Sequence, residues 1–254
     1  MDTLDDMTLV PHTTMRRRIA QHMVASTAVS AHAYAAIDVD YTAVDSVRHE
    51  VGQSWKQQHG FSLTYLPFVA RAVALAVDKY RKLNSKFTEA GLEVRRETGL
   101  GIAVDVNFEG LVVPVIPQAD HLSVSEIALA IHDLADRTRR GRLSAADVSG
   151  GTFTLSNPGP FGARMTFPII NQPQVAIMTV DAIALRPTVS SHPGSAPALA
   201  IRPIGNLTLA WDHRAFDGAY AASALSEIRT VLESRDWRSE LDPLFSPVEP
   251  PPAV

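Results

Sequence analysis

The stretch Trp211-Asp212-His213-Arg214-Ala215-Phe216-Asp217-Gly218 gathers a histidine, two acids and an arginine into one short corner. The apolar run Leu207 to Ala210 before it alternates like a strand, and the alanine-rich run after it predicts the start of a helix. Gly218 suits a sharp turn, because glycine adopts backbone angles that other residues avoid. A charged corner between a strand and a helix is either a solvated loop or a site that carries chemistry. His-x-x-x-Asp alone does not decide between them.

Composition excludes several classes of protein. The chain has 254 residues, 46% of them hydrophobic, and a formal net charge of −4. That length supports one large domain or two small ones. The mildly acidic balance argues against nucleic acid as the main partner, because phosphate binding needs clustered Lys and Arg. No apolar run approaches the roughly 20 residues of a membrane span, so no membrane association is expected.

The chain contains no cysteine, which excludes disulfides, thiolate metal sites and cysteine nucleophiles and fits a reducing compartment. The acidic N-terminus, Met1 to Asp6, is unlike a signal or transit peptide. We therefore expect a soluble, cytoplasmic protein.

Five segments have the apolar spacing of helices. The first is capped by Thr13 or Thr14, and its apolar stripe is Met15, Ile19 and Met23. Thr42 and Ser123 each open a capping-box pattern. A proline lies in the first turn of the third helix, where its missing N–H costs little. The expected helices span residues 14–24, 42–59, 66–83, 124–140 and 218–233.

Alternating or Val/Ile-rich runs predict strands at 34–40, 99–106, 111–116, 152–156, 174–180 and 207–210. The second and third of these flank Asn107-Phe108-Glu109-Gly110, which predicts a hairpin. Residues 188–198 are rich in Ser, Pro and Gly and predict an exposed loop. Because helices and strands mix without strict βαβ alternation, the expected class is α+β or mixed α/β, with one mixed sheet flanked by helices.

We expect three segments along the chain. Residues 1–12 form an N-terminal arm without clear periodicity, and residues 13–242 form the main folded domain. Residues 243–254 form a Pro-rich C-terminal tail, which cannot continue a helix.

A second informative stretch is Gly150-Gly151-Thr152-Phe153-Thr154-Leu155-Ser156-Asn157-Pro158-Gly159-Pro160-Phe161-Gly162. A strand ends here in the hydroxyl of Ser156, and a turn of Asn, Pro and Gly follows. Alone, this pattern fits an ordinary strand-to-loop transition with a solvated serine.

Together and in this order, the two stretches resemble the catalytic domain of the dihydrolipoamide acyltransferases, the E2 core enzymes of 2-oxo acid dehydrogenase complexes. The resemblance runs from about Leu9 to Leu244. The string Asp-His-Arg-x-x-Asp-Gly shares its His-x-x-x-Asp-Gly part with chloramphenicol acetyltransferase, which implies a chloramphenicol acetyltransferase-like fold. Further anchors are Arg16 with Ile19-Ala20 and Met23, residues 63–68, 101–105 and 110–116, and Pro168-Ile169-Ile170-Asn171.

The chemistry of acyl transfer between thiols defines a minimum set of groups. A free thiol has a pKa of about 8.5, so a base must take its proton as it attacks. A neutral histidine can do this near neutral pH. The tetrahedral oxyanion that follows gains roughly 3 kcal/mol from one well-placed donor. The resemblance assigns the base to His213 and the donor to Ser156, with no covalent acyl-enzyme.

Asp217 could orient His213 as in a Ser-His-Asp triad. The resemblance implies a different role, in which Asp217 holds the turn by pairing with an arginine from elsewhere, and Arg16 is the candidate. It also implies a homotrimer with its active sites at subunit interfaces. Ser156 of one chain would then meet His213 of its neighbour.

The resemblance implies coenzyme A as one substrate, a lipoyl group carried on a separate domain as the other, and no metal. Full-length members add a lipoyl domain and a domain that recruits the E1 and E3 components. Neither fits in this chain, which predicts an excised or standalone core. The Pro-rich ending replaces the apolar one that joins trimers, which favours a trimer over a larger multimeric core.

Two alternatives stay open: a CoA-dependent O-acetyltransferase of the chloramphenicol acetyltransferase type, and a non-catalytic scaffold. Acetyl, succinyl and branched-chain enzymes share these motifs, so the acyl group and the CoA contacts are not predicted. The other eight histidines, including His22, are expected to be ordinary surface or core residues.

Overall fold

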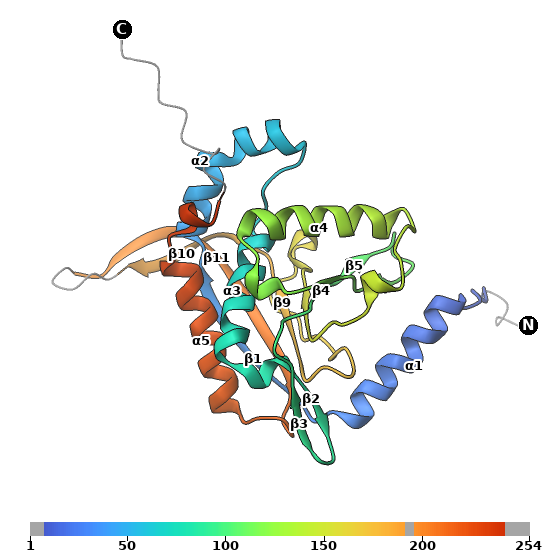
Figure 1. Cartoon of the computed structure of the whole chain (residues 1–254). Helices are drawn as coiled ribbons and strands as arrows, with labels where there is room; N and C mark the ends of the chain where they lie inside the picture. The colour runs from blue at the N-terminus through green and yellow to red at the C-terminus, as the bar shows by residue number, and fades with distance from the viewer. Residues whose placement is uncertain (1–7, 191–195, 242–254) are drawn as a thin grey trace, which may run out of the picture.

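The structure, a computed structural model, describes residues 8–190 and 196–241. Its centre is a seven-stranded sheet in the order β1-β11-β9-β8-β4-β7, with β10 paired to β11 (Figure 1). Strand β8 runs parallel to β4 and β9, and the other pairs are antiparallel. The predicted mixed sheet is confirmed. Its strands are β1 (His32–Asp40), β4 (Leu100–Ile102), β7 (Val115–Ile116), β8 (Phe153–Ser156), β9 (Ala176–Val180), β10 (Ala184–Ser190) and β11 (Ala198–Asp212).

Five α-helices accompany the sheet among the described residues: α1 (Thr14–Val29), α2 (Thr42–His59), α3 (Leu66–Lys79), α4 (Val124–Arg139) and α5 (Gly218–Ser234). Helix α3 is the core helix, packed between α4 and α5, and Phe68, Val69 and Val73 on it are fully buried. Helix α1 lies at the edge of the molecule (Figure 1), where the buried Ser26 hydroxyl donates to the Ile170 carbonyl at 2.6 Å. Short 3₁₀ helices are η1 (Arg81–Asn84), η2 (Ala119–His121), η3 (Ala146–Val148), η4 (Gly159–Phe161) and η5 (Trp237–Glu240). No helix of the described chain is long and apolar enough to cross a membrane.

Two small two-stranded sheets lie beside the main one: β2 (Ser85–Thr88) with β3 (Gly91–Val94), and β5 (Val104–Asp105) with β6 (Leu111–Val112). The second confirms the predicted hairpin. Its turn closes where the Glu109 N–H donates to the Val106 carbonyl at 2.9 Å. Asn107 and Phe108 between them have φ of 50° and 64°, the pattern of a type I′ turn.

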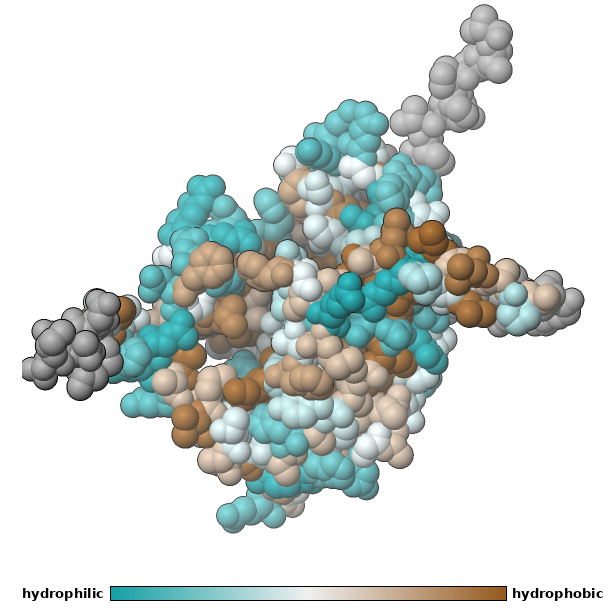
Figure 2. All heavy atoms as spheres, turned by 180° about the vertical axis from the view of Figure 1, so that it is seen from behind, coloured by the Kyte–Doolittle hydropathy of each residue, from teal (hydrophilic) through white to brown (hydrophobic). Residues whose placement is uncertain are grey.

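Strand β10 and the first half of β11 form a ribbon that projects from the body (Figure 1). The prediction of a loop over 188–198 was wrong at both ends, because Thr188 to Ser190 and Ala198 belong to these strands. Residues 191–195 of that prediction lie outside the described part. The strand before His213 is also longer than predicted. One ribbon face is exposed and apolar, with Leu185, Val189, Leu199 and Ile201, and hydrophobic residues follow this arm in Figure 2.

The hydrogen bonds at the N-termini of α1, α2 and α4 can be compared with the capping residues predicted from the sequence. The Thr13 hydroxyl accepts the Arg16 N–H at 3.1 Å, and Ser123 forms its capping box with Glu126, so both predictions are confirmed. Helix α1 continues past the predicted end to Val29. The capping box predicted at Thr42 was wrong. Tyr41 is the N-cap residue, and the Asp45 carboxylate instead accepts hydrogen bonds from Arg48 and Tyr65.

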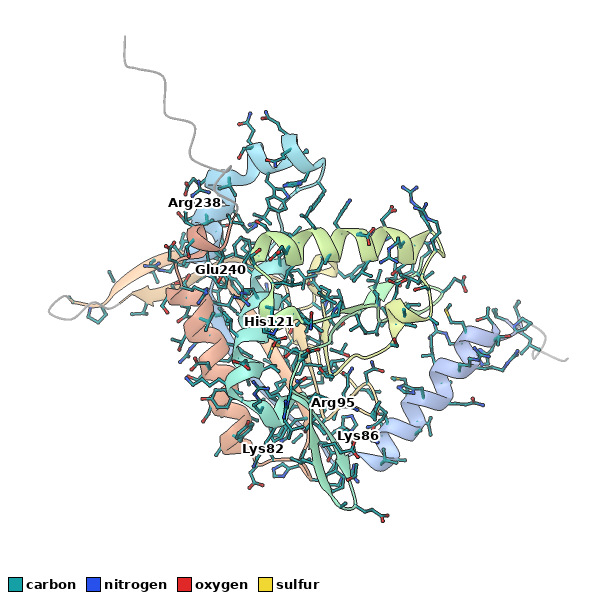
Figure 3. All side chains as sticks on the ribbon, viewed as in Figure 1. Lys82, Lys86, Arg95, His121, Arg238 and Glu240 are labelled. Atoms are coloured by element: carbon teal, nitrogen blue, oxygen red, sulfur yellow. The ribbon has the colours of Figure 1, made fainter. Side chains whose placement is uncertain are left out.

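The end of α5 is fixed to α3 through η5, whose Arg238 and Glu240 are labelled in Figure 3. Glu240 is nearly buried and accepts a hydrogen bond from Arg71 at 3.1 Å and another from Arg235. Arg238 pairs with Glu50 at 3.3 Å. This anchor ends the described chain. The predicted tail and residues 1–7 of the predicted arm lie outside it.

Candidate active site

The corner after β11 is built around a buried carboxylate. Asp212 is 2% exposed, and its oxygens accept the Arg214 backbone N–H at 3.0 Å and the Arg214 Nη2 at 2.6 Å. The Ala31 N–H is a further donor at 3.3 Å. Burial alone would raise the pKa of Asp212, but the hydrogen bonds from Arg214 outweigh it and hold the pKa below its usual range. The ionised pair fixes the corner's shape.

His213 follows directly and points outward. Its backbone N–H donates to the Ala31 carbonyl at 2.8 Å, while 49% of its side chain is exposed. Its Nδ1 lies 3.7 Å from the Asp217 carboxylate, which is beyond hydrogen-bond range. The Asp217 side chain is 91% exposed and caps nothing at the start of α5. A triad is therefore not formed within the chain. Gly218 begins α5 without a positive φ, so the turn role expected for it was wrong.

Ser156 lies at the other end of the sheet's central strands, half-buried in a groove of about 740 Å³. Helix α1 and residues 166–171 form its walls, and β8 and β9 form its floor. Figure 2 shows a hollow lined by hydrophobic residues on the side from which the N-terminus projects. Its apolar lining is Ile19, Met23, Ala103, Leu111, Val113, Phe167, Pro168, Ile169 and Ile177.

The hydroxyls on the groove floor differ in how they are used. The Thr154 hydroxyl donates to Gln174 at 2.7 Å, and the Thr179 hydroxyl donates to the Thr166 carbonyl at 3.2 Å. Ser156 is directly opposite Thr179 in the β8–β9 register, and its side-chain hydroxyl has no hydrogen-bond partner in the described chain. Its hydroxyl is therefore the one on this floor that is free to donate to a ligand.

Hydrogen bonds link polar side chains across the groove, from Thr154 on β8 through Asn171 to His22 on α1. The sequence did not predict that His22 takes part. The Asn171 amide contacts the Thr154 hydroxyl at 3.4 Å and holds the His22 Nε2 at 3.2 Å. His22 is an exposed histidine, as the sequence suggested, and it also borders the groove. The available signal was its place three residues after Ile19, beside the apolar stripe of α1.

One chain does not bring His213 and Ser156 together. Ser156 pairs with Thr179 of β9, and Thr179 pairs with Thr208 of β11. His213 lies five residues beyond Thr208. With a rise of about 3.3 Å per residue and strands about 4.8 Å apart, the Cα atoms of the two residues are roughly 19 Å apart, farther than the two side chains together can span. They cannot act on one carbonyl within a single chain.

Arg16 and Asp217 are not paired within the chain either. The Arg16 Nη2 donates to the Glu109 carbonyl at 3.0 Å, and Arg16 has no carboxylate partner in residues 8–190 and 196–241. The four predicted residues thus divide into two sets, Ser156 with Arg16 beside the groove, and His213 with Asp217 at the corner. No cluster of three or more potential metal ligands occurs in the described part of the chain.

Comparison with known proteins gives one consistent family. The family described as 2-oxoacid dehydrogenases acyltransferase (catalytic domain) matches residues 5–238. The lipoamide acyltransferase component of the Bacillus subtilis branched-chain alpha-keto acid dehydrogenase complex is 35% identical over 91% of this chain and 54% of its own length. The acetyltransferase component of the Corynebacterium glutamicum pyruvate dehydrogenase complex is 36% identical over 89% of this chain and 34% of its own. The chain thus spans about half or less of these relatives.

Solved structures agree. Azotobacter vinelandii dihydrolipoamide acetyltransferase, studied for the roles of a serine, a histidine and an asparagine in catalysis, has a TM-score of 0.84 and 29% identity, covering 93% of this chain and 95% of that one. The cubic core of a pyruvate dehydrogenase multienzyme complex has a TM-score of 0.84 and 28% identity, with the same coverage of both chains. Chloramphenicol acetyltransferase, 10% identical with a TM-score of 0.51 over 84% of this chain and 94% of that one, shares the fold alone. The predicted resemblance and fold are confirmed: the chain belongs to the catalytic-domain family of the 2-oxoacid dehydrogenase acyltransferases.

Proposed function

We propose that this chain transfers an acyl group between a dihydrolipoyl group and coenzyme A, as the E2 core of a 2-oxo acid dehydrogenase complex. The observation that carries the proposal is the free Ser156 hydroxyl in an apolar groove, in a chain that presents a half-exposed His213 on a rigid corner. A thioester and a long thiol-bearing arm are largely apolar apart from a few amides, and the groove has that character.

His213 acts as the general base. It takes the proton of the CoA thiol as the sulfur attacks the carbonyl carbon of the acyl-dihydrolipoyl thioester. The carbonyl oxygen becomes an oxyanion and accepts a hydrogen bond from Ser156. Collapse breaks the bond to the lipoyl sulfur, and protonated His213 returns its proton to that leaving thiolate. Each step is a proton or acyl transfer that these two side chains serve, and none needs a metal.

The site forms between copies of the chain. The separation of roughly 19 Å within one chain supports an arrangement in which Ser156 of one copy meets His213 of another. Such a contact is head-to-tail, and head-to-tail contacts can close into a ring. The family resemblance implies a ring of three copies. We therefore propose a homotrimer, and E1 and E3 partners that bind through domains other than 13–242.

Asp217 serves the corner's geometry in this proposal. In the Azotobacter enzyme the asparagine studied for its catalytic role lies four residues after the histidine, the spacing of Asp217 from His213. An asparagine cannot supply a triad's negative charge, so a carboxylate at that position is not required for catalysis. The unpaired Arg16 of another copy is the proposed partner of Asp217.

A thioester-exchange assay tests the proposal. The chain is mixed with dihydrolipoamide and acetyl-, isobutyryl- or succinyl-CoA, and release of free CoA thiol is followed. We expect turnover with at least one acyl-CoA. Turnover only with a hydroxyl acceptor such as chloramphenicol would indicate that the protein is a CoA-dependent O-acetyltransferase. No turnover with any acceptor would favour a non-catalytic scaffold. The panel also identifies the acyl group.

A further inference from the structure

The turn between β5 and β6 holds a phenylalanine in an unfavourable conformation. Phe108 has φ of 64°, a region that favours glycine and asparagine and in which a bulky side chain is an outlier. The Asp105 carboxylate helps to hold it, because both oxygens accept the Phe108 N–H, at 3.2 and 3.3 Å. An Asn-Gly pair would form this turn without strain.

Burial in the hydrophobic core of its own chain does not offset this strain, because the Phe108 side chain is not part of that core. Its side chain is 81% exposed, and it meets the edge of Phe161, itself 71% exposed, with ring centroids 6.2 Å apart. Two exposed aromatic rings side by side form an apolar surface, here called the aromatic platform, of the kind that marks contact sites. Strain combined with exposure indicates that the ring is presented to something outside the chain.

The platform is fixed to both borders of the Ser156 groove. Phe161 closes η4, three residues after the groove-lining Pro158. On the other border Gly110 packs so tightly on α1 that an added Cβ would lie 2.8 Å from the Ile19 Cδ1. The Arg16 side chain bonds the Glu109 carbonyl of the same turn. These contacts join the turn to α1, which forms one wall of the groove.

We propose that the aromatic platform is a docking surface for a second copy of this chain, the copy whose His213 enters the groove, and that Phe108 is a positioning residue for that copy. The inference rests on the proposed function, which requires two copies at each site. The charges beside the platform and beside His213 also indicate that a second copy of this chain binds there. Arg16 beside the platform lacks a carboxylate partner in the described chain, and Asp217 beside His213 is an exposed carboxylate without a hydrogen-bonded cation. Docking that pairs them brings the second copy's corner against the platform.

The test uses Phe108→Gly in the full chain. This change creates Asn-Gly, so it should raise or preserve the stability of the separated chain, measured by urea unfolding under dilution. Association should weaken, because a buried ring is lost: by sedimentation we expect the dissociation constant between copies to rise roughly 10- to 100-fold. Where dilution does not separate the wild-type copies, the rate of subunit exchange should rise instead. A merely structural residue would not move stability and association in opposite directions.

Two variants act as controls. Phe108→Tyr retains the ring and should associate like the wild type, and Val148→Ser removes an exposed apolar side chain of η3 and should also associate normally. Unchanged association of Phe108→Gly would overturn the proposal. Unchanged association with a raised KM for CoA would assign the platform to the adenine ring of CoA instead. If the wild-type chain showed no acyl transfer, the proposed function would fail, while the association result would still decide the docking surface.

Discussion

At the scale of single residues, His213 is positioned by its backbone and by its neighbours. The backbone N–H is held by the Ala31 carbonyl, and the Asp212–Arg214 pair shapes the corner, while the imidazole has no hydrogen-bonded acid. His213→Ala should therefore leave assembly intact and lower acyl transfer by about 10²- to 10⁴-fold, the contribution of one general base. Thioester exchange and sedimentation measure the two effects. Turnover near the wild-type rate would remove His213 from the mechanism.

Ser156 is predicted to act mainly on the transition state. Ser156→Ala should lower kcat by about 10²- to 10³-fold with a much smaller change in the KM for CoA, because an oxyanion donor binds charge that the substrate lacks. Ser156→Thr keeps the hydroxyl and is the matched control, with most of kcat retained. An effect confined to KM would make Ser156 a substrate-binding residue.

The Asp212–Arg214 pair gives a prediction in pH. The pKa of Asp212 lies below its usual value, so its contribution to stability is complete above the unfolded-state pKa of about 3.9 and is lost as pH falls through the lower folded-state pKa. Asp212→Asn should cost roughly 1 to 3 kcal/mol at pH 7. Unfolding of both proteins in urea should show this difference unchanged at pH 5 and shrinking below about pH 4. A difference that grew on acidification would contradict the sign.

The sequence pointed to His213 and Ser156 as candidate residues, but it did not predict which side chains pair with one another around them. The string around His213 and the strand end at Ser156 are local patterns, and the chemistry of thiol transfer names the residue types directly. That Asp212, rather than Asp217, binds an arginine within the chain depends on a turn that folds Arg214 back onto the strand. The Asn171–His22 contact joins residues 149 positions apart, so no local pattern could indicate it.

At the scale of secondary-structure elements, Arg16 of α1 and Asp217 before α5 carry opposite charges, and neither has a permanently charged partner in the described chain. If Arg16 of one copy binds Asp217 of another, Arg16→Met and Asp217→Asn should have non-additive effects on association, with a coupling of about 0.5 kcal/mol or more. A double-mutant cycle on the association constant measures it. Strict additivity would show that the two side chains do not interact.

Elements with strong local signals were predicted well, and elements that tertiary pairing decides were not. The Thr13 cap and the Ser123 box use hydrogen bonds within one turn, so the sequence contains the whole interaction. At Thr42 the same pattern failed, because Tyr65, 20 residues away from Asp45, competes for that carboxylate. The ribbon was missed because its Ser, Pro and Gly composition favours a loop, while pairing in register makes it two strands.

At the scale of the whole molecule, a site divided between copies predicts complementation. His213→Ala chains and Ser156→Ala chains should each be inactive, and mixing them should restore activity after subunit exchange. In a ring of three, random mixing leaves three-quarters of the rings mixed, each with one working site of three, so recovery should approach roughly a quarter of wild-type activity. Mass spectrometry verifies that mixed rings form. Mixed rings without activity would place both groups in one chain.

The length of β11 has a consequence for how the molecule exchanges its amide hydrogens with solvent. The strand spans 15 residues from the projecting ribbon to Asp212. Residues Leu207 to Trp211 pair with β1 on one side and β9 on the other and are buried, whereas residues 198–203 pair with β10 alone. Deuterium should therefore enter the ribbon half through local opening and the buried half only when the sheet as a whole opens. His213 is joined to the slowly exchanging end, so conditions that loosen the ribbon should leave the corner at His213 closed.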